Sequence, residues 1–366
     1  MRNLKTAIRM NLRRFAELFT VPCIAFLLLI AGCKPDDPEP WPAPETDYTK
    51  GIFIINEGGF TAGNASVSWK HPDTAAVRHD VFNLVNGEAL GDVLNSASTD
   101  GKSLFLVVNN SQKVEVVDIN DFKSLGTITG ATMPRYFLQI GINFGLLSDW
   151  GSNEVKVVNL VTYSTDTTLA TGQGPEELTM CNGFAYVANS GGFGIDSTIT
   201  CINISSHGIH KQEIIHPGPY SLVADVNDNL WILCQGDYKL FADTSDDVGG
   251  ALVKYDPATE TVVKKYLFPN QEHPNKMAID HTGENIYYLN KGAVWKFSIS
   301  GNALPSTPFI QKSFYGIDID KTNGKIYCAD AGDFSSAGAI EVYDAGGVLI
   351  ETIEAGVAPN GVVFPW

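Results

Sequence analysis

The chain has 366 residues, of which 44% are hydrophobic and 10% aromatic, so it can bury a sizeable core. Its formal charge is −16, and because residues 1–32 carry five basic residues and one acid, the remainder is near −20. This acidic balance argues against nucleic acid as a partner, which requires a basic surface, and against docking on anionic lipid through charge alone.

Residues 1–32 are predicted to be a lipoprotein signal peptide. A basic stretch from Arg2 to Arg14 precedes the apolar run PCIAFLLLIAG, which is short for a membrane-spanning helix. The run ends in LIAGC, which resembles a bacterial lipobox, so Cys33 is the predicted site of lipidation. An ordinary secretory signal and an uncleaved anchor are the alternatives.

Residues 33–50 are predicted to form an extended tether. The segment KPDDPEPWPAPETDYTK contains five prolines and five acids, a composition that excludes a helix and favours a solvated chain. Lys34 followed by Asp36 and Asp37 resembles the tag that directs Bacteroidetes lipoproteins to the outer face of the outer membrane. We therefore expect a lipid-anchored protein at the outer membrane that faces the cell exterior, with a simple spacer as the alternative.

Four cysteines lie beyond the lipidation site, at positions 181, 201, 234 and 328. They show neither CxxC nor Cys/His spacing, so no zinc or other metal site is predicted. Cys234 and Cys328 stand in the apolar stretches LWILCQG and KIYCADAG, which indicates buried free thiols. A disulfide between Cys181 and Cys201 is left open.

From Gly51 onward, seven segments each pair an apolar run with a second, alternating run about a dozen residues later. In chain order the first runs are FIINEG, FLVVNN, GLLSDW, AYVANS, WILCQG, YYLNKG and IYCADAG. The second runs are ASVSWK, KVEVVD, EVKVVN, TITCIN, ALVKYD, AVWKFS and AIEVYD. Alternation at period two, with aromatic and β-branched residues between turn clusters, predicts β-strands.

A short strand opens each unit, and an outer strand is expected to complete each later unit at four strands. The opening strands are marked by Gly91, Pro134, Pro175, Pro219, Pro274, Tyr315 and Pro359, at steps of 43, 41, 44, 55, 41 and 44 residues. The longest step contains the insertion YKLFADTSDDVGG. A four-stranded repeat of this length is typical of a β-propeller.

The first unit, residues 51–80, has only three predicted strands, and the last segment, APNGVVFPW, is expected to supply its innermost strand. Joining the chain ends in one sheet removes the two bare edges that an open ring would leave. We therefore predict an all-β fold over residues 51–366, a seven-bladed β-propeller closed by N- and C-terminal strands that share one blade. Two β-sandwich domains are the alternative.

Several stretches resemble one known family: INEG with the following GNASVSW, LGD, VVNNSQKVEVVD, MPRY, GQGPEEL, LWILCQG and DAGDFSSAG. They resemble the YncE-like seven-bladed propeller lipoproteins of Bacteroidetes from Gly51 to Phe364, and within them the cobalamin-capturing BtuG group. The resemblance implies a surface-exposed lipoprotein that captures a corrinoid (cobalamin) and delivers it to a TonB-dependent outer-membrane transporter. Other relatives of this family have no assigned ligand.

Two sets of loops are expected to converge on one mouth of the central channel, those after each second strand and those before each innermost strand. The predicted ligand-binding residues are Asn56, Glu57, Asn109, Asn110, Arg135, Tyr136, Asp149, Trp150, Glu176, Asn189, Tyr220, Gln235, Tyr238, Asn290, Lys291, Tyr315, Asp330 and Phe334. The same loops carry Glu177, Asn275, Lys276, Phe314 and Asn360. Amides can match the carboxamides of a corrinoid as donor and acceptor, and aromatic rings add rigid contact area. Turn capping is the alternative for Asn and Asp at strand ends.

The sequence gives little support for catalysis. We therefore predict a binding protein rather than an enzyme, with a corrinoid as ligand and no cofactor. The chain lacks GxSxG, HExxH and a Ser/His/Asp pattern. Glu176, Glu177 and Asp149 could supply the acid–base pair of a lactonase-type hydrolase, although acids at a solvated rim are usually only solvated. A protein-interaction or envelope-scaffold propeller without a small ligand is the other alternative.

Overall fold

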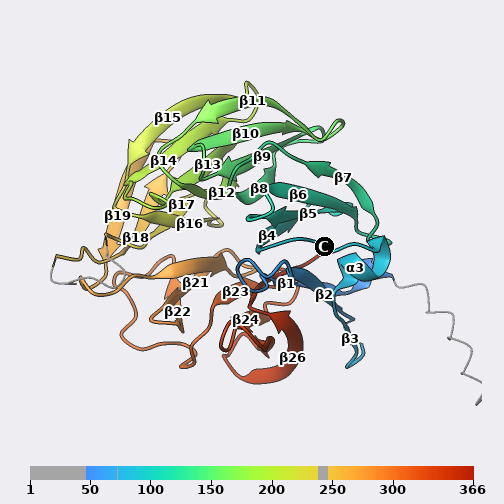
Figure 1. The fold of residues 1–366 in the computed structure, drawn as a ribbon. Coiled ribbons are helices and arrows are strands. Elements are labelled where there is room, and N and C mark those ends of the chain that lie inside the picture. Colours follow the sequence, from blue (N-terminus) through green and yellow to red (C-terminus); the bar gives the residue numbers. More distant parts are fainter. Residues whose placement is uncertain (1–46, 72, 238–245) are drawn as a thin grey trace, which may run out of the picture. The chain divides into compact units, whose positions relative to one another are not determined.

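Seven antiparallel sheets follow one another along the chain in the computed structural model, which describes residues 47–71, 73–237 and 246–366 (Figure 1). The predicted signal peptide, the lipidation site Cys33, nearly all of the tether, Tyr238 and most of the insertion lie outside the described residues. We number the sheets as blades 1–7 in the order in which the chain enters them after the first 3₁₀ turn, η1 (Tyr48–Lys50).

The strands of each blade are given from the innermost outward. Blade 1 contains β27 (Pro359–Val363), β1 (Ile52–Asn56), β2 (Ser66–Lys70) and β3 (Val77–Arg78), and α3 (Val81–Asn86) leads from it to blade 2. Blade 2 contains β4 (Leu94–Thr99), β5 (Ser103–Val108), β6 (Lys113–Asp118) and β7 (Ser124–Ile128). Blade 3 contains β8 (Pro134–Gln139), β9 (Phe144–Asp149), β10 (Glu154–Asn159) and β11 (Ser164–Ala170).

The remaining blades continue the same order. Blade 4 contains β12 (Pro175–Cys181), β13 (Phe184–Asn189), β14 (Thr198–Asn203) and β15 (Gly208–Ile214). Blade 5 contains β16 (Pro219–Ala224), β17 (Leu230–Cys234), β18 (Ala251–Asp256) and β19 (Thr261–Leu267). Blade 6 contains β20 (Asn275–Ile279), β21 (Asn285–Asn290) and β22 (Ala293–Ser298). Blade 7 contains β23 (Gly316–Ile319), β24 (Ile326–Asp330), β25 (Ala337–Tyr343) and β26 (Leu349–Val357).

Blade 6 departs from the four strands expected of every later unit. Its described residues form three strands, and only an isolated bridge between Val294 and Ile310 stands where an outer strand was predicted. The segment that follows β22 contains Pro305 and Pro308. Because proline has no backbone N–H, it cannot donate to a strand ladder, and two prolines so close together prevent a regular outer strand.

The ring closes in blade 1, as predicted. Strand β1 pairs antiparallel with β27, and Phe53 lies opposite Val363 while Ile55 lies opposite Gly361. On its other sides β27 contacts β23 of blade 7 and β4 of blade 2. The innermost strands of neighbouring blades contact one another around the whole ring, so the all-β seven-bladed propeller is confirmed.

The hydrophobic core is divided among the seven junctions between neighbouring blades, with one buried cluster at each junction. Aromatic pairs mark several of them: Phe105 of blade 2 stacks on Phe137 of blade 3 with ring centroids 4.3 Å apart. Trp231 of blade 5 meets Phe297 of blade 6 at 5.5 Å. Burying a side chain of this size contributes about 2–3 kcal/mol, so each blade depends on both neighbours for its stability.

The four described cysteines are all buried and free, which confirms the expected thiols and excludes the Cys181–Cys201 disulfide. Burial raises the pKa of Cys181 to about 12 and that of Cys201 to about 11. These thiols therefore remain protonated at neutral pH and act as small apolar groups of the core.

Candidate ligand-binding site

We call the mouth the end of the ring at which the second strand of each blade stops and the innermost strand begins. In blade 2 the backbone N–H of Asn109 donates to the carbonyl of Val93 at 2.8 Å, which joins the two loops. In blade 1 the N–H of Glu57 donates to the carbonyl of Ala358 at 3.0 Å. Loops before innermost strands and loops after second strands therefore lie at the same end.

Six innermost strands, β4, β8, β12, β16, β20 and β27, begin with a break in register against the second strand of their blade. In β8, for example, Pro134 pairs with Asp149 and Phe137 with Leu147, so two residues stand opposite one. A bulge of this kind bends the strand and redirects the extra side chains. The bulged residues are Asn95, Arg135 with Tyr136, Glu176 with Glu177, Tyr220, Lys276 and Asn360.

Arg135 and Glu176 form a buried ion pair between blades 3 and 4. The Arg135 Nη2 lies 2.8 Å from Oε1 of Glu176 and Nε lies 3.0 Å from Oε2, so the guanidinium binds both carboxylate oxygens. Glu176 is fully buried, and the guanidinium lies 4.1 Å from the centre of the Trp150 ring. Burial opposes the charge of Arg135, but Glu176 outweighs it and raises the pKa of the guanidinium above its ordinary value.

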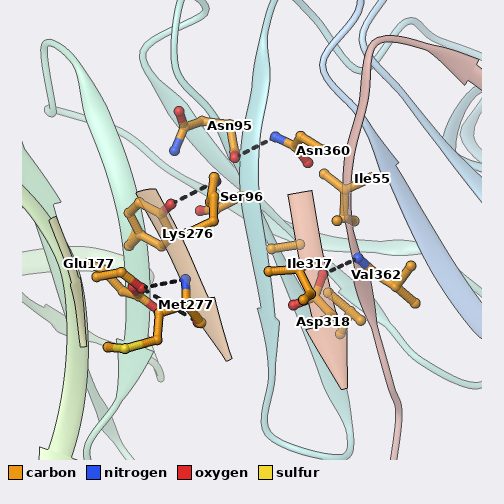
Figure 2. Close-up of a pocket in the computed structure, with 15 residues that line it drawn as sticks. Ile55, Asn95, Ser96, Glu177, Lys276, Met277, Ile317, Asp318, Asn360 and Val362 are labelled. Carbon is orange, nitrogen blue, oxygen red and sulfur yellow. Dashed lines mark hydrogen bonds between the residues drawn. The ribbon is translucent and has the colours of Figure 1, made fainter. Parts of the chain in front are cut away.

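Glu57 connects blades 7 and 1 at the point of closure. The Tyr315 hydroxyl donates to both Glu57 carboxylate oxygens at 3.1 and 3.2 Å, and the Asn360 amide donates to Oε1 at 2.8 Å. The same Asn360 amide donates to the carbonyl of Asn95 at 2.8 Å, which ties blade 1 to blade 2 (Figure 2). Three neighbouring blades are thus held together by side chains of the mouth.

Lys276 lies at the mouth on β20 of blade 6. Its ammonium donates to the Tyr136 hydroxyl of blade 3 at 3.2 Å and lies 5.8 Å from the centre of that ring. Burial alone would lower the pKa of Lys276, but its electrostatic interactions with Tyr220 and Tyr315, and then with Glu57 and Glu176, raise it. The ammonium is therefore charged at neutral pH.

Below the mouth, the central channel contains a cavity of about 100 Å³. Figure 2 shows polar side chains from different blades turned toward it, among them Asn95, Glu177, Lys276 and Asp318. The walls between them are apolar, with Ile55, Met277, Ile317 and Val362. At roughly 30 Å³ per water molecule, this cavity holds only a few waters.

Glu177 and Asp318 are two carboxyl groups of this channel that carry no ion pair among the described residues. Burial raises the pKa of each to about 7. Hydrogen bonds oppose this rise, from Ser221 and the backbone N–H of Leu222 (3.1 Å) to Glu177 and from the backbone N–H of Val362 (2.8 Å) to Asp318. The charge of Lys276 also opposes it at both carboxyls. The charge inside the channel therefore changes around neutral pH.

Two aromatic clefts flank the mouth. One, of about 460 Å³, is lined by Trp150, Phe193 and the glycine-rich loop 191–194 of blade 4. The other, of about 200 Å³, is lined by Phe314, Tyr315 and Phe334 of blade 7. Phe193 is 87% exposed and meets Trp150 edge-on at 5.8 Å, while Phe334 is 49% exposed and meets Tyr315 edge-on at 4.9 Å.

A family model described as "Domain of unknown function (DUF5074)" matches residues 50–365, which is almost the whole of the propeller. The chain belongs to the DUF5074 family. No curated protein matches the sequence of this DUF5074 chain.

Solved structures resemble the fold at low sequence identity. A quinoprotein alcohol dehydrogenase-like protein from Bacteroides thetaiotaomicron has 15% identity and a TM-score of 0.65, and the match covers 88% of this chain and 79% of that one. Hydrazine synthase from Kuenenia stuttgartiensis has 16% identity and a TM-score of 0.54, with 72% and 86% covered. The computationally designed protein Ika8 has 12% identity and a TM-score of 0.56, with 85% and 90% covered. At these identities the likeness shows the fold of the DUF5074 propeller alone.

The structure brings part of the predicted ligand set together at the mouth of this DUF5074 propeller. These residues are Glu57, Arg135, Tyr136, Trp150, Glu176, Tyr220, Tyr315 and Phe334. Tyr220 joins the group as the bulged residue of β16, near Glu176 and Lys276. Contact of any of them with a ligand stays a prediction.

A second part of the predicted set is buried between strands and bonded within the fold. Asn56 and Asn189 each donate to two hydroxyls of the neighbouring strand, Ser66 and Ser68 for the first and Thr198 and Thr200 for the second. Asp149 accepts hydrogen bonds from the backbone N–H groups of Thr132, Met133 and Gly151. Asn109 donates to the carbonyl of Pro134, and Asn290 donates to Glu272. The contacts of Asp149 are the turn capping that the sequence left open for strand ends. The amide N–H groups of the four asparagines instead bond hydroxyl, carbonyl and carboxylate oxygens.

Four further predicted residues, Asn110, Gln235, Lys291 and Asp330, have partners within the fold. Asn110 is exposed and bonds Asp92, Lys291 pairs with Glu272, and Asp330 pairs with Lys312. The carbonyl of Gln235 bonds the His273 ring at 2.8 Å. Tyr238 lies outside the described residues.

Sequence reasoning missed the channel residues Asn95, Ser96, Ser221 and Asp318. A usable signal was present, because Ser221 and Asp318 stand on predominantly apolar innermost strands, at positions from which period two places a side chain on the channel face. No group of three or more His, Cys, Asp or Glu among residues 47–71, 73–237 and 246–366 is arranged to hold a metal ion.

Proposed function

We propose that this DUF5074 propeller is a binding protein rather than an enzyme, and that it holds a small organic ligand over the mouth. The observation that carries the proposal is the set of bulges. They direct a charged pair, tyrosines and amides from different blades toward one opening, while two aromatic clefts flank it. Bulges of this kind are over-represented next to functional sites, where they aim side chains.

The size of the cavities limits where such a ligand would lie. The channel holds about 100 Å³, whereas pockets that enclose drug-sized ligands are about 300–1,000 Å³. A large ligand would therefore lie across the mouth instead of entering the channel. Its apolar faces would meet Trp150 with Phe193 on one side and Tyr315 with Phe334 on the other, and its polar groups would face Lys276 and Asn360.

A corrinoid is the ligand that we propose for this mouth. Its flat macrocycle offers apolar faces to the aromatic clefts, and its peripheral carboxamides match the amide and hydroxyl groups between them. The resemblance to cobalamin-capturing lipoproteins supports this identity, and with it delivery to a TonB-dependent transporter from an outer-membrane lipid anchor at Cys33. The described residues include no helix with the length and hydropathy of a membrane span.

Calorimetry of residues 47–366 with cyanocobalamin tests the proposal, and we expect binding at micromolar concentration or below. Trp150→Ala removes an aromatic platform of the mouth and should weaken binding at least tenfold, which corresponds to about 1.4 kcal/mol. Tyr163→Phe, in the turn before outer strand β11, is the control and should bind as the unchanged protein does. The absence of binding to the unchanged protein would contradict the corrinoid identity and favour the scaffold alternative.

A further inference from the structure

Lys276 is held in a backbone conformation that is unfavourable for its residue type. Its φ is +45°, in the left-handed region that side chains with a Cβ rarely adopt, and it is the bulged residue of β20. Strained positions of this kind persist where the surrounding structure imposes them, and they are concentrated at functional sites. The conformation places the lysine side chain in the channel (Figure 2).

The ammonium of Lys276 is incompletely satisfied by protein. Of its three N–H groups, one donates to the Tyr136 hydroxyl, and no carboxylate of the described chain lies within 4.0 Å. Arg135 differs, because its guanidinium is bound by Glu176. The hydroxyl of Tyr220, the bulged residue of β16 near Lys276, also has no hydrogen-bond partner in the described part of the chain. Donors that are free of protein partners thus face the channel and mouth.

The charges around Lys276 decide which acceptor these donors suit. Four carboxyl groups, Glu57, Glu176, Glu177 and Asp318, interact with or surround two cations, Lys276 and Arg135. The carboxyl groups outnumber the cations, so an anionic ligand would be repelled by the surplus negative charge. The repulsion would increase as Glu177 and Asp318 lose their protons. A neutral carbonyl oxygen accepts the same hydrogen bonds without that repulsion.

We propose that Lys276 anchors the ligand of the mouth and that it binds a neutral carboxamide oxygen in preference to a carboxylate. The inference rests on the proposed function in requiring a ligand at the mouth, and it does not depend on that ligand being a corrinoid. Lys276 is then a specificity-determining residue, and the group that it recognises is a neutral carboxamide.

Benzamide and benzoate are a matched pair of probes, since they share a ring and differ in the group that would reach Lys276. Their dissociation constants can be measured by ligand-observed NMR at pH 7.5 on the unchanged protein, on Lys276→Met and on Lys123→Met. Methionine keeps the length of the lysine stem, and Lys123 is an exposed residue paired with Asp121 in an outer turn. Thermal melts establish that each variant is folded.

We expect benzamide to bind the unchanged protein and the Lys123→Met variant equally, and to bind Lys276→Met at least fivefold more weakly. Benzoate should bind the unchanged protein at least threefold more weakly than benzamide at pH 7.5, and this difference should narrow at pH 5.5. Equal affinities for the two probes, an unchanged affinity in Lys276→Met, or no binding of benzamide would overturn the inference. Calorimetry with cyanocobalamin measures corrinoid binding separately. The corrinoid identity and the carboxamide preference of Lys276 can therefore be contradicted one without the other.

Discussion

At the mouth, Arg135 and Glu176 show how a buried charge is made tolerable. Glu176 has no exposed surface, and taking its carboxylate out of water costs several kcal/mol unless a cation and hydrogen bonds replace the water. The bidentate guanidinium supplies both, and the Trp150 ring covers the cation. The pair therefore fixes the positions of two bulges and one aromatic ring together.

Replacing Glu176 with Gln should destabilise the fold, because the Arg135 cation would remain buried without its counter-charge. We expect a loss of about 3 kcal/mol in the free energy of unfolding, measured by urea denaturation. Glu213→Gln is the control, since Glu213 forms a pair with Lys211 that is about one-third exposed and should cost less than about 1 kcal/mol. Equal losses in the two variants would show that the buried pair has no special role. Because Glu176→Gln is expected to destabilise the fold, a loss of activity in that variant would not identify a catalytic role. Glu177→Gln is the better test of the hydrolase alternative.

The raised pKa values of Glu177 and Asp318, about 7 in the folded state, predict a dependence of stability on pH. Unfolded carboxyls titrate near pH 4, so between about pH 4 and 7 the folded state binds more protons than the unfolded state. Stability should therefore fall as pH rises through this window, and the penalty of the two carboxylates should be complete above about pH 7.

Glu177→Gln and Asp318→Asn mimic the protonated groups and should remove this penalty. We expect each variant to be about 1–2 kcal/mol more stable than the unchanged protein at pH 8, with the difference disappearing near pH 4. Urea denaturation at a series of pH values measures it. Variants that differ from the unchanged protein by the same amount at both pH values would contradict the assignment.

At the scale of the strands, the sequence predicted where each innermost strand begins, but it did not predict the bulge in that strand. The landmarks Pro134, Pro175, Pro219 and Pro359 each begin such a strand in the structure. The bulge that follows each of them depends on how one strand lies against the next, which no local pattern specifies. Only the bulges reveal that Lys276 and Asn360 are turned inward.

The same limit explains the strand-end amides. Asn56, Asn109 and Asn189 stand at equivalent ends of second strands, where an amide can face either a ligand or the backbone of a neighbour. Their partners are residues nine or more positions away or in the next blade, such as Ser66 and the carbonyl of Pro134. Choosing between binding and capping required those tertiary contacts.

Because β23 and β27 approach each other closely, Gly316 of β23 should not tolerate a larger residue. A Cβ added at Gly316 would lie 2.0 Å from the carbonyl oxygen of Asn360, which is backbone and cannot move without shifting the closing strand. Gly316→Ala should lower the free energy of unfolding by about 2–3 kcal/mol in a urea titration. Gly141→Ala is the matched control, because a Cβ there meets nothing within 4 Å. A neutral Gly316→Ala variant would show that the two strands are not in contact.

Over the whole ring, the sequence predicted seven units and their closure because the 41- to 55-residue steps reflect one repeated sheet. It did not predict the missing outer strand of blade 6, where Pro305 and Pro308 interrupt a segment that the repeat alone would have counted as a strand. Each junction buries its own cluster, so loss of one blade exposes apolar surface on both of its neighbours.

Closure should therefore control the cooperativity of the entire propeller. Deleting residues 359–366 removes β27, uncovers the edge of β1 and breaks the contacts of blade 1 with β23 and β4. Because the two clusters that flank blade 1 include Val362 and pack against Val363, both would be opened to water. We expect the single calorimetric unfolding transition of residues 47–366 to broaden or split, and limited proteolysis to begin in blade 1. Deletion of Trp366 alone leaves β27 intact and should keep the single transition. A truncated chain that unfolds as one sharp transition at an unchanged temperature would show that the terminal strand does not close the ring.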